Sequence, residues 1–168
     1  MTDPMEGLVA LQEALDAGYV TMGKCELHSE INFLRDEPLP GEPRYTYAVI
    51  ESGRVLCSVT VAPNGRYNGL PCLQIGYSVI DSARGKGLAT TTVRRAIEEL
   101  QSQLSRTGVA SFYIEAVVAS NNTPSNKLAS RLLSANPERS TDSLSGTKTY
   151  TYLKLYSATD ADANVEGI

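Results

Sequence analysis

The chain has 168 residues, a length that fits one hydrophobic core better than two. Hydrophobic residues make up 42% of it and charged residues 20%, which is typical of a globular protein and argues against wholesale disorder. The formal net charge of −4 argues against broad binding to a nucleic-acid backbone, which needs an excess of lysine and arginine.

The cysteine and histidine content narrows the chemistry further. Three cysteines without a CxxC spacing predict neither a disulfide framework nor a zinc site, and His28, the single histidine, weakens any Ser/His or Cys/His mechanism. No apolar run approaches the roughly 20 residues of a membrane helix, and the opening MTDPMEG lacks the order of a signal peptide. We therefore expect a cytoplasmic protein that binds no metal, does not associate with a membrane and does not bind nucleic acid directly.

The first 44 residues predict helices followed by a loop. Leucine and valine at helical spacing predict a helix over 5–16, and residues 25–33 are a candidate second helix. Residues 35–44 contain three prolines and a glycine, which predicts a loop that leads into a strand.

A three-stranded meander is predicted next. β-Branched and aromatic residues at 45–50 and 55–61 flank a Glu-Ser-Gly turn, a pattern typical of a hairpin. Pro63-Asn64-Gly65 predicts a break, and residues 73–80 form the third strand.

The second half alternates helices and strands. Leu88, Ala96, Leu100 and Leu104, with Thr92 between the first two, recur at every fourth position, which predicts an amphipathic helix. Residues 112–118 form an apolar run typical of a strand that is buried on both sides, and a helix is expected over 123–133. Residues 137–146 are polar and predict a loop before a final strand at 148–155.

A glycine-rich turn joins the third strand directly to the amphipathic helix: Arg84-Gly85-Lys86-Gly87. The first N–H groups of a helix have no intrahelical partner and lie at the positive end of its dipole, so they hold phosphate oxygens well. Gly85 and Gly87 remove side chains that would obstruct such an approach, and Arg84 and Lys86 add positive charge.

Two common nucleotide loops do not fit this turn. The chain has no Gly-Lys-Ser/Thr triplet of a Walker loop, and Thr90 stands where a dinucleotide fingerprint needs glycine. A tight turn without a ligand and a site for another phosphorylated ligand both remain open from these residues alone.

Two motifs carry a family resemblance. Arg84-Gly-Lys-Gly-Leu-Ala89 resembles the Arg/Gln-x-x-Gly-x-Gly/Ala signature of the GCN5-related N-acetyltransferase (GNAT) family. Asn122-Thr-Pro-Ser125-Asn-Lys-Leu128, after the strand that holds Glu115, resembles its second signature. The resemblance covers about residues 45–156 and is closest to the RimJ/RimL-like branch, which acetylates protein N-termini and other amines.

The resemblance implies an α/β fold: a mixed, mainly antiparallel twisted sheet with flanking helices and a splayed pair of central strands. One acetyltransferase-like domain is expected over 1–156, and residues 157–168, which are acidic and rich in small residues, are expected to form a flexible tail. Acetyl-CoA would be the cosubstrate, its pantetheine between strands 73–80 and 112–118. The cofactor contacts carried over are Val79, Ile80, Arg84, Gly85, Lys86, Gly87, Leu88, Ala89, Thr90, Asn122 and Ser125.

The reaction that the resemblance implies is acetyl transfer to a primary amine by direct attack in a ternary complex. The amine would belong to a peptide N-terminus, a small molecule or an aminoacyl group, and relatives are frequently homodimers. Glu115 is the candidate base or amine-binding group, although its carboxylate could serve only a hydrogen bond to a neighbouring strand or loop.

Two departures from the family pattern affect the chemistry. Many members place a tyrosine, as the donor to the departing thiolate, where this chain has Ala129, so Ser125 becomes the candidate donor, unless its hydroxyl only satisfies backbone groups. Leu133-Ser134 replaces the usual Gly-Phe. An acyl-CoA-binding sensor or interaction protein without catalysis is therefore the alternative function.

The tyrosines of the final strand are the last candidates. Tyr150, Tyr152 and Tyr156 recur at even spacing and either line an acceptor cleft or form ordinary sheet surface.

Overall fold

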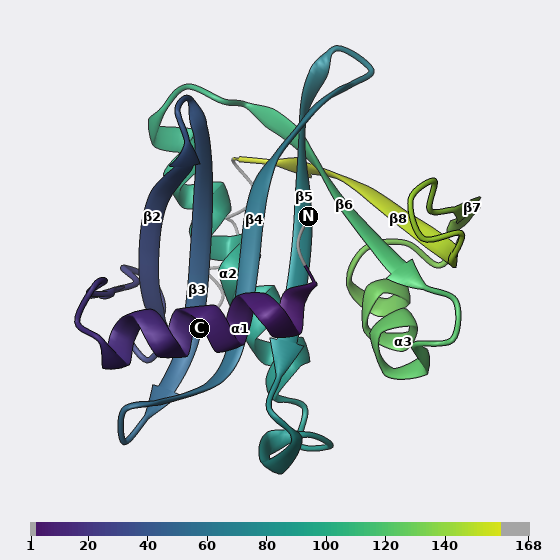
Figure 1. Cartoon of the computed structure of the whole chain (residues 1–168). Coiled ribbons are helices and arrows are strands. Elements are labelled where there is room, and N and C mark those ends of the chain that lie inside the picture. Colours follow the sequence, from purple (N-terminus) through teal and green to yellow (C-terminus); the bar gives the residue numbers. More distant parts are fainter. Residues whose placement is uncertain (1–2, 159–168) are drawn as a thin grey trace.

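The N-terminal helix begins at a side-chain cap. The Asp3 carboxylate accepts a hydrogen bond from the Met5 N–H at 2.7 Å, which satisfies one of the free donors of the first turn. The computed structural model describes residues 3–158, and α1 spans Pro4–Asp16, which confirms the predicted first helix. Leu8 and Leu11 are buried, so α1 lies across one face of a sheet (Figure 1).

The described residues form one sheet of eight strands with the order β1-β2-β3-β4-β5-β6-β8-β7. Its strands are β1 (Gly23–Lys24), β2 (Asn32–Leu39), β3 (Glu42–Glu51), β4 (Arg54–Tyr67), β5 (Leu70–Val79), β6 (Ser111–Ala119), β7 (Glu138–Thr141) and β8 (Lys148–Ser157). Neighbouring strands are antiparallel except β5 and β6, which are parallel.

The parallel pairing of β5 and β6 is short, and a gap opens between the two strands where the pairing ends. β5 and β6 pair only over Cys72–Gln74 and Tyr113–Glu115, at one end of both strands. Beyond that point the two strands diverge (Figure 1). The mixed, mainly antiparallel sheet with a splayed central pair is therefore confirmed.

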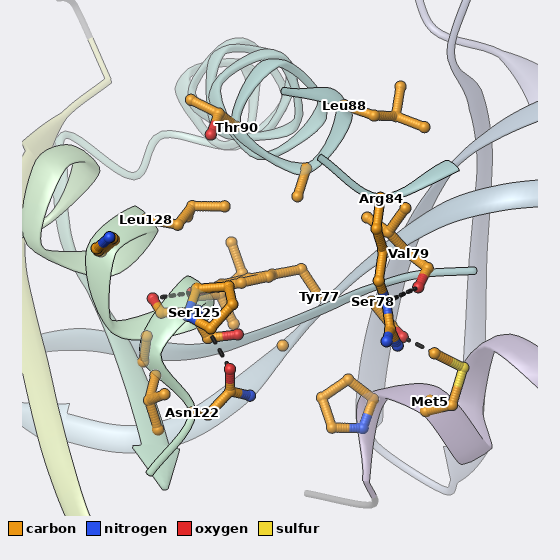
Figure 2. Close-up of a pocket in the computed structure, with 18 of the residues that line it drawn as sticks. Met5, Tyr77, Ser78, Val79, Arg84, Leu88, Thr90, Asn122, Ser125 and Leu128 are labelled. Carbon is orange, nitrogen blue, oxygen red and sulfur yellow. Dashed lines mark hydrogen bonds between the residues drawn. The ribbon is translucent and has the colours of Figure 1, made fainter. Parts of the chain in front are cut away.

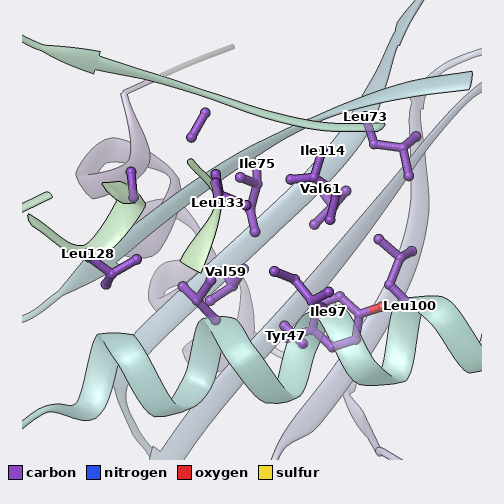
Figure 3. Packing of buried hydrophobic residues seen from close by; sticks show 14 of the residues in the cluster. Tyr47, Val59, Val61, Leu73, Ile75, Ile97, Leu100, Ile114, Leu128 and Leu133 are labelled. Carbon is purple, nitrogen blue, oxygen red and sulfur yellow. The ribbon is translucent and has the colours of Figure 1, made fainter. Parts of the chain in front are cut away.

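The opposite face of the sheet is covered by α2 (Leu88–Arg106) and α3 (Thr123–Leu132), and a short 3-10 turn, η1 (Asp81–Ala83), precedes α2. Ile97 and Leu100 of α2 pack on Tyr47 and Val59 of the sheet in the main core (Figure 3). None of these helices is long and apolar enough to span a membrane, among the residues that the structure describes.

The candidate helix over 25–33 is wrong. Residues 26–30 form a turn and β2 begins at Asn32. The N–H groups of Glu26, Leu27 and His28 donate to the buried Glu99 carboxylate at 3.3, 2.6 and 2.7 Å. A tertiary contact therefore takes the donors that a helix would have used.

The loop expected over 35–44 is wrong as well. β2 and β3 form a hairpin here, turning at Gly41 with a φ of 76°. β1 pairs with β2 only at Asn32 and Phe33, so the rest of β2 is an edge that tolerates prolines. The pairing register shifts between Asp36 and Leu39 to accommodate them.

Pro63-Asn64-Gly65 is not a break between strands. β4 continues to Tyr67, with a register shift between Pro63 and Arg66, and the chain turns at Asn68-Gly69. The bulge lies beyond Val61, the last β4 residue that pairs with β3. The meander before the glycine turn therefore has four long strands, β2 to β5, instead of three.

The helices and strands predicted for the C-terminal half are confirmed except at three points. β6 is not buried on both sides, because its residues alternate and Val117 is 43% exposed. The loop over 137–146 contains the edge strand β7. Ser157 still pairs with Ser111 and Ala158 is buried, so the expected tail over 157–168 starts inside the fold, and residues 159–168 lie outside the described ones.

Candidate functional site

A cavity of about 800 Å³ occupies the gap between the diverging strands. Residues 75–79 of β5 form one wall and residues 116–119 of β6 form the other. The N-terminal ends of α1 and α2, and α3 from its N-terminus to Arg131, complete the lining. Figure 2 shows Val79 and Arg84 on one side of the open space, with Asn122 and Ser125 on the other.

The β5 wall presents backbone groups to this cavity that have no partner on β4. The Ile80 N–H donates to the Leu56 C=O at 3.0 Å, which makes these two residues a hydrogen-bonded antiparallel pair. Because hydrogen-bonded and non-bonded pairs alternate, the backbone groups of Tyr77 and Val79 point away from β4, toward the gap. Val79 therefore lines the cavity as expected. Ile80 does not line the cavity, and its N–H is already bonded to Leu56.

The glycine turn lies at the mouth of the cavity and has the expected form. Gly85 and Gly87 adopt φ values of 75° and 74°, a left-handed conformation that favours glycine. Gly87 is the N-cap of α2 and provides no side-chain acceptor for the N–H groups of the first turn. These donors face an open site, which suits an anionic ligand.

The two cations of the turn have different surroundings. The Arg84 Nε donates to the Val79 C=O at 3.1 Å, and its Nη1 lies 2.8 Å from an Asp81 carboxylate oxygen. Lys86 does not line the cavity, whereas Leu88, Ala89 and Thr90 do. The turn therefore presents amides and one partly neutralised guanidinium.

The N-terminus of α3 is completed by its own side chains. The Asn122 Oδ1 accepts a hydrogen bond from the Ser125 N–H at 3.2 Å, so Asn122 caps the helix. Both residues line the cavity. The Ser125 side chain also hydrogen-bonds with the Tyr77 phenol, and both residues line the cavity.

Tyr77 is a cavity residue that the sequence did not single out. Its hydroxyl donates to the Ser125 C=O at 3.0 Å and so connects β5 with α3 across the gap. Burial raises the pKa of Tyr77 to about 12, so the phenol stays protonated near neutral pH. The signal that could have found it is its place two residues before Val79, on the strand that the resemblance assigned to the cofactor.

Glu115 lies at the apex of the gap, in the last pair that joins the two strands, opposite Gln74. Its carboxylate accepts a hydrogen bond from the Asn64 side chain at 2.9 Å, and the residue does not line the cavity. The Glu115 carboxylate therefore has a structural hydrogen bond, to β4 on the far side of β5, beside any catalytic role.

Ala129 and the C-terminal tyrosines belong to the core instead of the cavity. Ala129 is fully buried in the main hydrophobic cluster. The Tyr152 hydroxyl donates to the Asn126 side chain at 2.8 Å and the Tyr156 hydroxyl to the Leu132 C=O at 3.1 Å. These rings, with Tyr150, pack on the core, and none of the three lines this cavity.

A sheet that splays around a cavity, with an uncapped helix N-terminus at its mouth, defines an α/β protein suited to a long phosphorylated ligand that lies between two strands. The family model for the acetyltransferase (GNAT) domain matches residues 13–132. The chain belongs to the GNAT family, which confirms the resemblance carried by the two motifs.

One solved structure supports the fold. A GNAT-family acetyltransferase from Streptococcus pneumoniae aligns over 67% of each chain with a TM-score of 0.51 and 14% identity, a likeness that shows the fold alone. A ribosomal-protein-alanine N-acetyltransferase from Brucella melitensis aligns over 67% of this chain and 69% of its own, with a TM-score of 0.49 and 16% identity. RimJ from Mycobacterium smegmatis, solved with CoA-disulfide, aligns over 73% of this chain and 60% of its own, with a TM-score of 0.49 and 17% identity. No curated protein matches the chain significantly.

Proposed function

We propose that this protein transfers an acetyl group from acetyl-CoA to a primary amine. The observation that carries the proposal is the uncapped N-terminus of α2, whose free amides open into the cavity between the splayed strands. Family membership supports the same activity. The thioester of acetyl-CoA would supply an electrophilic acyl group for direct attack by the amine in a ternary complex.

The residues that hold the cosubstrate divide into two groups. The amides from Gly85 to Thr90, together with Arg84, would hold the diphosphate. The backbone groups of Tyr77 and Val79 would bind the amides of the pantetheine arm, because their orientation leaves them without a strand partner.

The catalytic assignments follow from position. Glu115, at the apex, would bind the acceptor ammonium or take up its proton, since a free lysine-like amine has a pKa of about 10.4 and must lose a proton to attack. The Ser125 hydroxyl would donate to the departing thiolate, and the protonated Tyr77 phenol, which reaches Ser125 from the β5 wall, is a second candidate donor.

The acceptor follows from the resemblance to the RimJ/RimL-like branch: the amine of a peptide N-terminus, a small molecule or an aminoacyl group. Release of free thiol from acetyl-CoA with a broad panel of such amines tests the activity directly. Thermal unfolding with acetyl-CoA, ATP and NAD tests the ligand class, because a ligand at 100 times its dissociation constant adds about 2.7 kcal/mol to stability. A shift with ATP alone contradicts the proposal.

A second candidate function rests on Ala129, which removes the hydroxyl that many relatives place there and is buried in the core. An acyl-CoA-binding sensor without catalysis would be stabilised by acetyl-CoA yet release no thiol with any amine. The two measurements together therefore separate an enzyme from a binding protein.

A further inference from the structure

The α3 wall of the cavity carries two cations that the proposed function has not used. Lys127 and Arg131 are four residues apart on α3, so they lie on one face of the helix, and both line the cavity. Both side chains are exposed, and neither forms an ion pair with a carboxylate within residues 3–158.

The cavity is therefore cationic in a chain whose net charge is −4. Arg84, Lys127 and Arg131 line it, and within the described lining Asp3 is the one carboxylate. Asp3 already accepts the cap bond of α1, at 2.7 Å from the Met5 N–H. This arrangement favours a ligand with more negative charge than a single diphosphate.

The α2 and α3 sides of the cavity attract anions through different groups. The α2 turn offers amides, and its guanidinium is partly neutralised by Asp81. The first turn of α3 is capped by Asn122, so α3 contributes charged side chains instead of free amides. The cavity thus has uncapped amides on its α2 side and cationic side chains on its α3 side.

Coenzyme A carries two anionic groups that its ribose separates: the diphosphate and the 3′-phosphate. We propose that Lys127 and Arg131 bind the 3′-phosphate, while the glycine turn binds the diphosphate. This inference rests on the proposed function. Arginine and lysine suit a phosphate monoester because the guanidinium fork bonds two of its oxygens and the ammonium adds a point charge. The pair would make this protein distinguish coenzyme A from its 3′-dephospho form.

Titration calorimetry with coenzyme A and 3′-dephospho-coenzyme A tests the inference. The unmodified protein should bind coenzyme A about tenfold more tightly, since charge-assisted hydrogen bonds to a phosphate are the stronger kind. In the variant Lys127→Gln with Arg131→Gln, the affinity for coenzyme A should fall about tenfold, while that for the dephospho form changes less than about twofold. Lys148→Gln, an exposed lysine on β8 outside the cavity, is the matched control and should bind both ligands as the unmodified protein does.

Three outcomes overturn parts of the account separately. Equal binding of both ligands by the unmodified protein contradicts the 3′-phosphate site and leaves the proposed function intact, and this comparison needs no variant to fold. Equal weakening of both ligands in the double variant assigns the two cations to the diphosphate instead. Absence of binding by either ligand to the unmodified protein removes the proposed function itself, and the inference with it.

Discussion

The N-termini of α2 and α3 border the same cavity but are completed in different ways. Gly87 precedes α2 without a side-chain cap, whereas Asn122 caps α3 through the Ser125 N–H. The first turn of α3 therefore needs no ligand to satisfy the Ser125 N–H. α2 leaves its first donors without a side-chain cap, an arrangement that suits an anionic ligand.

A third group of amides shows what the fold does where no ligand is needed. The N–H groups of residues 26–28 donate to the fully buried Glu99 carboxylate of α2. An internal carboxylate here satisfies converging amides, as an external phosphate would do at Gly87. Mutations at these three groups of amides should therefore have different consequences.

The largest effect is expected from Gly87→Glu. The added carboxylate would repel the diphosphate, and like-charge contacts cost several kcal/mol, so affinity for acetyl-CoA should fall about 1000-fold or more. Gly108→Glu is a matched control, because Gly108 has a φ of 82° beside 74° at Gly87, and an added Cβ meets no atom within 4 Å at either position. Both variants should lose about 1–2 kcal/mol of stability, but only Gly87→Glu should lose binding in calorimetry.

Glu99→Gln should mainly destabilise the fold. The amide replaces charged acceptors with one neutral oxygen and a donor, so we expect a loss of about 3 kcal/mol in the free energy of unfolding. Glu98→Gln, on the same helix, removes the partly buried pair with His28, which is a single contact, and should cost about 1 kcal/mol. Urea denaturation measures both, and similar losses in the two variants would contradict the role of Glu99.

Ser125→Ala should affect turnover and spare binding. If the hydroxyl donates to the departing thiolate, kcat should fall about 100-fold, the lower end for general acid catalysis, with the dissociation constant of acetyl-CoA unchanged. Thiol-release kinetics and calorimetry measure the two quantities. A variant that retains full kcat would assign the donor role elsewhere, with Tyr77 as the next residue to test through Tyr77→Phe.

The smallest effect is expected at the capped helix. Asn122→Ala should lower stability by about 1 kcal/mol, the usual cost of removing an N-cap acceptor. Asn122→Asp should restore most of that loss, because aspartate accepts the same bond. Thermal unfolding of the three proteins checks this ranking, and equal stability would show that the cap contributes little.

The regular elements of this fold were predictable where local pattern and packing agree. α1, α2, β5 and β8 all carry periodic apolar residues, and the structure has them close to their predicted bounds. The sequence failed where a distant residue decides the outcome. The turn over 26–30 depends on Glu99, about seventy positions away, and the prolines near residue 40 are tolerated because the end of β2 is a sheet edge.

The backbone that surrounds the cavity could be predicted from the sequence, whereas the side chains that line the cavity could be predicted only in part. The glycine turn and Asn122 line it as expected, since both are fixed by a strand–turn–helix junction. Tyr77, Lys127 and Arg131 line it too, but a lone tyrosine or an exposed cation has no distinctive pattern in sequence. Lys86 was expected there and does not line the cavity, because a side chain in a turn can face either way.

Backbone amide chemical shifts during a titration with acetyl-CoA test the central claim most directly. The largest changes should fall on the amides of Gly85 to Thr90 and on Val79, with a smaller change at Ser125, whose N–H is already bonded to Asn122. Saturation that leaves the amides from Gly85 to Thr90 unmoved would contradict the claim that the uncapped N-terminus of α2 holds the diphosphate.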